Sequence, residues 1–365
     1  MACAVTCAQA ISFSEIFLLT SMRKDRDPSF DAFRGLAIIA VITNHALYIG
    51  DSLYNPKLLY FFQLLLFAVP VFFFISGYWS SKSPIESLAD YRNFLGKRFQ
   101  RVLIPYLFWS VILLGYLAIK YHNISGYKMI YLLLSGGIWT GYYFIVVLAQ
   151  LYVITPVLQY INRRLNKYGL ILVVVFYIIT LLVLYLSLVF KVIWTLPHTR
   201  LFYSWIIYYE IGLFVGTHNS DVFATRKRRF FLLFGVLAFC LVSAVEAGVI
   251  LSKYNNLSFA MFPMKYSSFL YSVCVILGFL SVKEYFGRLP GLLSTIGHYS
   301  FGIYFIHVII LGLVIRCIQK FSVIYSFQPL YHLMLVVITL SLCLILIITA
   351  RKLLPEFICT KILGF

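Results

Sequence analysis

Ten long apolar stretches dominate the sequence and limit what the chain can fold into. Each is close to the 20 or so residues that an α-helix needs to cross the hydrocarbon core of a bilayer. None shows the strict alternation of apolar and polar residues that marks the strands of a membrane barrel. We therefore predict an all-α integral membrane protein with about ten transmembrane helices, near residues 32–50, 58–80, 102–121, 141–161, 170–190, 201–217, 230–252, 266–282, 298–318 and 329–350.

Composition excludes several other classes of protein. Charged residues make up 12% of the chain, about half of what a soluble domain carries, so a single water-soluble core is excluded. The net charge of +18 is distributed in short basic groups between the apolar stretches, which argues against a nucleic-acid partner. The seven cysteines are scattered without a CxxC pair or a His/Cys cluster, so neither a disulfide framework nor a metal site is predicted.

The distribution of basic residues predicts the orientation. With the N-terminus inside, 21 of the 30 Lys and Arg residues fall on the inner side, which by the positive-inside rule places both termini in the cytoplasm. Residues 81–101 are expected to form a basic loop along the membrane surface, and 123–140 a short interfacial or re-entrant piece. We expect one polytopic membrane domain over 28–365, preceded by a cytoplasmic extension, 1–27, whose role in function stays open.

Polar groups inside an apolar stretch are costly and therefore mark candidate sites. Arg34 and His45 are 11 residues apart, which is close to three full helical turns, so they share one helix face. The rise between them is about 16 Å. Arg34 is thus expected at the cytoplasmic surface and His45 near mid-membrane. The alternative is that Arg34 is only a topology anchor and His45 only a packing residue.

Four further polar residues within or beside the apolar stretches are candidate site residues for the same reason. Arg98 and Arg101, an i, i+3 pair where the third helix enters the membrane, face one way and could bind phosphates. His307 is predicted at a depth similar to that of His45, and Glu210 close to the midplane. An ordinary basic flank for the arginines, and helix-to-helix hydrogen bonding for His307 and Glu210, remain open.

Weaker polar signals give three candidate substrate-binding residues: Tyr142, Gln150 and Ser76. Taken together, the predicted pattern places three arginines at the inner surface and two histidines and a carboxyl at mid-depth. That arrangement suits a polyanionic donor that binds from the cytoplasm and extends its reactive end into the membrane.

A set of motifs then occurs in a fixed order over residues 28–310. It comprises FDAFRGLAIIAVITNH with Arg34 and His45, VPVFFFISGYW, Arg98 and Arg101 before LIPYLFW, YYFIVVLAQLYVITPVL and SFGIYFIH. In this order they resemble the acyltransferase-3 family of bacterial membrane O-acyltransferases. One departure is Tyr143-Phe144, where the family often has Trp-Phe.

The resemblance implies transfer of an acyl group, usually acetyl from acetyl-CoA, to a sugar hydroxyl of lipopolysaccharide O-antigen, capsule or exopolysaccharide. The location implied is the inner (cytoplasmic) membrane, and the partners are acyl-CoA, a carbohydrate or lipid-linked glycan, and the bilayer. On this reading Arg34, Arg98 and Arg101 hold the phosphates of CoA. Neutral His45 acts as base or carries the acyl group itself, and Glu210 or His307 orients His45 or binds the sugar.

Two alternatives stay open at this stage. Within the enzyme class, succinyl or another acyl group could replace acetyl. From another class, a proton-coupled secondary transporter would use His45, Glu210 and His307 as a proton relay. Thermal stabilisation by CoA would separate the two classes, because a proton-coupled transporter should not show it. The oligomeric state is not indicated by the sequence.

Overall fold

The structure is a computed structural model that describes residues 27–49, 56–121, 125–139, 141–190, 198–218, 225–287, 291–320 and 328–365. Most of the predicted N-terminal extension lies outside these residues. The helices are α2 (Pro28–Ile49), α3 (Pro56–Gln63), α4 (Ala68–Ser81), α5 (Leu88–Tyr121), α6 (Gly126–Ser135), α7 (Tyr143–Leu165), α8 (Lys167–Val189), η2 (His198–Arg200), η3 (Phe202–Ser204), α9 (Ile206–Thr217), α10 (Arg226–Tyr254), α11 (Leu257–Ala260), α12 (Tyr266–Phe286), α13 (Gly291–His298), α14 (Ser300–Ile318), α16 (Gln328–Leu353) and the π-helical η5 (Ile358–Leu363).

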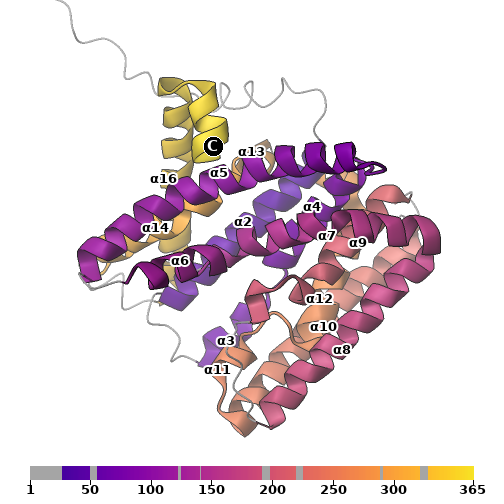
Figure 1. Ribbon diagram of the computed structural model, residues 1–365. Coiled ribbons are helices and arrows are strands. Elements are labelled where there is room, and N and C mark those ends of the chain that lie inside the picture. The colour runs from indigo at the N-terminus through magenta and orange to yellow at the C-terminus, as the bar shows by residue number, and fades with distance from the viewer. Residues whose placement is uncertain are drawn as a thin grey trace, which may run out of the picture.

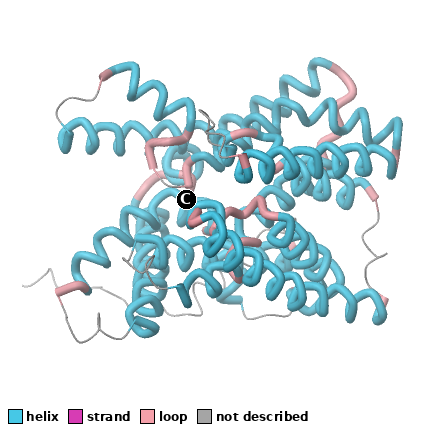
Figure 2. Tube along the Cα trace, turned by 90° about the horizontal axis from the view of Figure 1, so that it is seen from below, coloured by secondary structure: helices cyan, strands magenta, loops and turns pink. Residues whose placement is uncertain are grey.

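The predicted fold class is confirmed. In the described part of the chain, nine helical segments are long and apolar enough to cross a membrane, and Ile206–Thr217 is a shorter apolar helix in the place of the sixth predicted span. Figure 2 shows helices joined by loops and no strand among the described residues. The orientation of the termini stays a prediction.

Helix α2 lies at the centre of the arrangement. It contacts α4, α12, α13, α14 and α16, and most of its apolar side chains are buried, among them Phe30, Phe33, Ile38 and Ile42. Figure 1 shows α14 and α16 on one side of the molecule and α8, α10 and α12 on the other. The helix that carries Arg34 and His45 is therefore fixed from several directions.

Small residues allow the closest helix contacts. A Cβ atom added at Gly77 of α4 would lie 2.0 Å from the backbone oxygen of Tyr209 in α9, and one added at Gly212 would lie 2.1 Å from that of Phe74. Helices in a bilayer associate by such close packing, because lipid provides no hydrophobic driving force between them. The α4–α9 contact thus requires glycine at these two positions.

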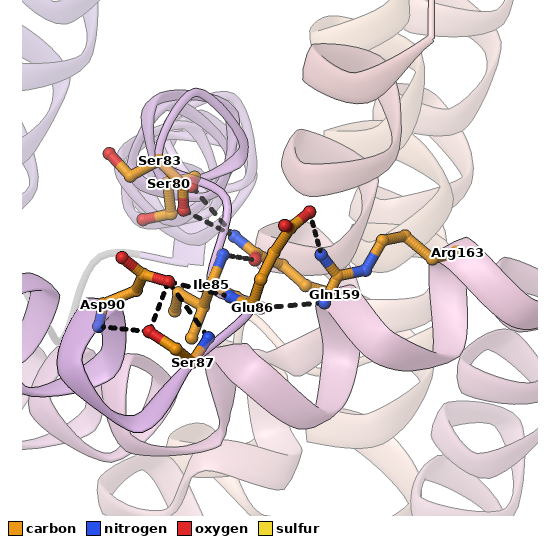
Figure 3. A network of polar contacts seen from close by, with 8 residues as sticks. All are labelled: Ser80, Ser83, Ile85, Glu86, Ser87, Asp90, Gln159 and Arg163. Carbon is orange, nitrogen blue, oxygen red and sulfur yellow. Dashed lines mark hydrogen bonds and ion pairs between the residues drawn. The ribbon is translucent and has the colours of Figure 1, made fainter.

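One sequence-based expectation is wrong. Residues 88–101 do not form a surface loop, because they are the first part of α5, a helix of 34 residues. Ser87 and Asp90 cap its N-terminus reciprocally: the Ser87 amide donates to Asp90 Oδ2 at 3.0 Å, and the Asp90 amide donates to Ser87 Oγ at 3.1 Å (Figure 3). The many charged and polar residues of this segment led to the loop prediction, whereas the Ser87–Asp90 cap marks the start of a helix.

Candidate active site

A single cavity of about 880 Å³ contains most of the predicted site residues. Its volume is within the range of pockets that hold cofactor-sized ligands. Arg34, Arg98 and Arg101 line it at what we call the arginine end, and His45 lines it at what we call the histidine end. Because its lining residues run from Asp27, just before α2, to His45 near the end of this helix, the cavity extends along most of the length of α2.

The arginine end is held by contacts with neighbouring helices. Arg34 donates to Asp31 at 2.8 Å, one turn earlier in α2. Arg98 donates to the backbone oxygen of Trp79 at 3.0 Å, and its guanidinium lies over the rings of Phe94 and Tyr152. These contacts use part of each guanidinium and fix its plane beside the cavity.

The segment between α4 and α5 completes this end. The side chain of Gln159 in α7 donates to the backbone oxygens of Ser80 and Ser83, each at 3.1 Å, and accepts from the Ile85 amide at 3.0 Å (Figure 3). Ser83 and its neighbour Lys82 line the cavity. The buried side-chain amide of Gln159 thus fixes the backbone on both sides of Lys82, which adds a fourth cationic side chain to this end of the cavity.

At the histidine end, the structure brings His45 and His307 together. Their ring centroids are 5.2 Å apart with an interplanar angle of 40°. His45 lines the cavity and is half-buried, whereas His307 does not line it and is buried behind it. A Cβ atom added at Gly141 would lie 3.6 Å from Nε2 of His45, so this nitrogen points toward a backbone position on the cavity wall.

The protonation pattern of neutral His307 follows from its contacts. Nδ1 lies 3.0 Å from the backbone oxygen of Ile303 and 2.8 Å from that of Tyr304. Because a carbonyl can only accept, Nδ1 carries the proton. Nε2 is buried and has no hydrogen-bond partner among the described residues. It is therefore an acceptor with a free lone pair close to the ring of His45.

The three predicted substrate-binding residues do not share one place. Ser76 lines the cavity. Tyr142 donates to the backbone oxygen of Phe305 at 3.2 Å, and Gln150 bridges the backbones of Arg200 and Phe202 at 3.1 and 2.9 Å. Neither Tyr142 nor Gln150 lines the cavity. Both hold α7 against its neighbours.

The structure does not bring Glu210 to this site. Its side chain is fully buried, its carboxyl oxygens have no hydrogen-bond partner among the described residues, and it is not among the residues that line the cavity. Of the three groups predicted at mid-depth, the two histidines are therefore neighbours and the carboxyl is not.

Sequence reasoning missed several residues that line the cavity. Asn44 precedes His45, and Thr199 and Ser258 come from η2 and α11. Asn44 was detectable, since it is an amide within an apolar helix. Thr199 and Ser258 were not, because they lie outside the long apolar stretches and only tertiary contacts bring them to the cavity. No group of three His, Cys, Asp or Glu within the described ranges could hold a metal ion.

Comparison with known proteins identifies the family of the chain. A family model described as an acyltransferase domain, that of the acyltransferase-3 family, matches residues 27–349. The nodulation protein NolL of Sinorhizobium fredii is 25% identical over 239 residues, which is 64% of this chain and 61% of that protein. NolL of Mesorhizobium japonicum is 34% identical over 95 residues, 24% of each chain.

The chain therefore spans at most about six-tenths of the length of these curated relatives. No solved structure matches it. The family match covers most of the sequence, including all the cavity-lining residues from Asp27 to Tyr304. The protein belongs to the acyltransferase-3 family and is a multi-pass membrane protein.

Proposed function

We propose that the protein transfers an acyl group, most simply acetyl, from acyl-CoA to a hydroxyl of a cell-envelope glycan such as O-antigen, capsule or exopolysaccharide. The observation that carries the proposal is the cavity: it joins a cluster of three arginines to His45. The inner (cytoplasmic) membrane is the proposed location, with the arginine end toward the cytoplasm, as the positive-inside rule predicts.

The arginine end suits the donor. CoA carries several phosphates at one end of a long flexible arm and a thioester at the other. Guanidinium groups bind phosphates through paired hydrogen bonds, and three of them with Lys82 surround this end of the cavity. From there an apolar passage leads toward His45, lined by Val69, Phe72, Ile75, Val102, Phe144 and Leu148. The rise of about 16 Å between Arg34 and His45 is comparable to the reach of an extended pantetheine arm.

His45 supplies the base in this proposal. The ring centroids of His45 and His307 are 5.2 Å apart, and Nε2 of His307 has no hydrogen-bond partner among the described residues. A rotation of either ring would let this lone pair accept the proton on Nδ1 of His45. That leaves Nε2 of His45, the nitrogen facing Gly141, with its lone pair available. A base needs to be within about 3 Å of the proton it removes, which the cavity wall permits here.

The transfer then balances within the site. Nε2 of His45 removes the proton of the acceptor hydroxyl while the hydroxyl oxygen attacks the thioester carbonyl carbon. The carbon–sulfur bond breaks, the ester forms, and the imidazolium returns the proton to the leaving CoA thiolate. The alternative is a covalent route in which Nε2 attacks the thioester first and holds the acyl group until the acceptor arrives.

The proton-relay alternative loses support, because it needed Glu210 together with both histidines and the carboxyl is not at the cavity.

The proposed function is tested by mass spectrometry of envelope glycans from cells with and without the gene, together with acetyl transfer by purified protein. We expect the glycan to lose an O-acetyl group without the gene. Purified His45→Ala should bind CoA but transfer no acetyl, and Arg98→Ala should raise the KM for acetyl-CoA. Unchanged glycans, or wild-type transfer by a folded His45→Ala variant, would refute the proposal.

A further inference from the structure

The histidine end of the cavity differs in chemistry from the arginine end. All the charged residues that line the cavity within the described ranges belong to the arginine end: Asp27, Asp31, Arg34, Lys82, Arg98 and Arg101. The residues around His45 at the other end carry no formal charge. We assign to this end the lining residues from the second half of α2, from α3, which follows α2, from η2, whose Arg200 lies beside Gly137, and from α11 and the residues after it, which Gln63 joins to α3. They combine short polar side chains with apolar and aromatic ones: Asn44, Thr199, Ser258, Phe62, Met261, Phe262 and Pro263.

The polar side chains at this end are available to a ligand. The side chains of Asn44, Thr199 and Ser258 form no hydrogen bond with any residue in the described part of the chain. The neighbouring Thr43, by contrast, donates to the backbone oxygen of Ile39 at 2.9 Å. An amide and two hydroxyls on the wall of one cavity are thus left with their full hydrogen-bonding capacity.

The wall that carries Ser258 is rigidly built. The backbone oxygen of Ala260, at the end of α11, accepts from Nζ of buried Lys265 at 2.9 Å and from the side chain of Gln63 at 3.3 Å. The side chain of Asn256 accepts from the Phe259 amide at 2.9 Å and caps the start of this short helix. These bonds hold α11 against α3, so the free hydroxyl of Ser258 has a fixed place on the rim.

We infer that the histidine end is a binding subsite for a neutral sugar residue, in which Asn44, Thr199 and Ser258 bind hydroxyls and Phe62, Phe262 and Pro263 pack against the apolar face of the ring. The inference rests on the proposed function, since it places the acceptor opposite the donor with His45 between them. An anionic sugar would lose its hydration here, and no described residue that lines this end carries a cationic group to bind it. The subsite therefore selects an uncharged residue of the glycan.

The test uses purified protein, acetyl-CoA and base-deacetylated envelope glycan from the producing cells. Asn44→Ala with Ser258→Ala should lower kcat/KM for the glycan at least tenfold and leave the KM for acetyl-CoA within twofold. The matched controls Thr43→Ala and Ser252→Ala should behave as wild type, because each side chain bonds only its own helix backbone. Mass spectrometry of the product should place the acetyl ester on an uncharged sugar.

A second measurement keeps the inference testable if the double variant does not fold. Ser258→Cys, labelled with a membrane-impermeant maleimide, should lose glycan acetylation and keep its KM for acetyl-CoA. Ser252→Cys, labelled alike, should retain both, with treated wild type as the baseline for native cysteines.

Three results would overturn the inference: wild-type kcat/KM for the glycan in the double variant, a change confined to the KM for acetyl-CoA, or an ester on a uronic acid or phosphorylated sugar. If wild-type protein transfers no acetyl to the glycan at all, it is the proposed function that fails.

Discussion

At the scale of single residues, the structure places His45 and His307 differently with respect to the cavity. His45 touches the cavity, and His307 lies behind it with Nδ1 bonded to backbone and Nε2 free among the described residues. In the proposed function, His307 would be a positioning residue that selects which nitrogen of His45 carries the proton. A second-layer partner of this kind fixes the orientation and tautomer of a base.

This role predicts a difference between two substitutions. His307→Phe removes the acceptor and should lower kcat about 10²-fold, within the usual range for disturbed acid–base catalysis, with the KM for acetyl-CoA unchanged. His307→Gln keeps an acceptor oxygen and should recover part of the loss. Steady-state kinetics of the two variants measure this. Equal activity of the Phe variant and wild type would remove His307 from the mechanism.

At the scale of helices and their contacts, the α4–α9 pair has no room for a larger side chain at its closest approach. Gly77→Ala places a methyl group where the backbone oxygen of Tyr209 now lies, so the helices must separate. We expect a loss of about 1–3 kcal/mol in the free energy of unfolding, as for other overpacked cores. Gly312→Ala is the control, because nothing lies within 4 Å of its added Cβ. Thermal unfolding in detergent measures both, and equal midpoints would show that the helices are not this close.

The contact between α3 and α11 predicts a pH dependence. Burial lowers the pKa of Lys265 to about 7, against the opposing influence of Glu246. In the unfolded chain a lysine has a pKa near 10.4. Between these values the unfolded chain binds a proton that the folded protein lacks, so stability rises with pH over this window, by at most about 1.4 kcal/mol per unit.

Lys265→Met removes this contribution. Thermal unfolding between pH 7 and 9 should show a shallower rise for the variant than for wild type. The same slope in both proteins would mean that Lys265 does not change its protonation on folding.

At the scale of the whole molecule, the sequence was sufficient for the long apolar helices and for the residues that share one of them, but not for the polar first part of α5. Arg34 and His45 needed only helical periodicity and are correctly found on one cavity. The sequence was insufficient where the position of a side chain depends on how the helices pack against one another. Glu210 was predicted from its depth alone, and depth does not tell which neighbour a side chain faces. Thr199 and Ser258 reach the site only through tertiary contacts, so no local pattern marked them.

In the proposed function the cavity is one passage through the molecule: the acyl group enters at the arginine end and leaves at the histidine end, while CoA stays on the side of the arginine end. The direct measurement uses vesicles with the arginine end outward, loaded with base-deacetylated envelope glycan and given labelled acetyl-CoA only outside. The account predicts labelled acetyl on the enclosed glycan with wild-type protein and none with His45→Ala. Label that never reaches the enclosed glycan, or that reaches it equally with His45→Ala, would contradict it.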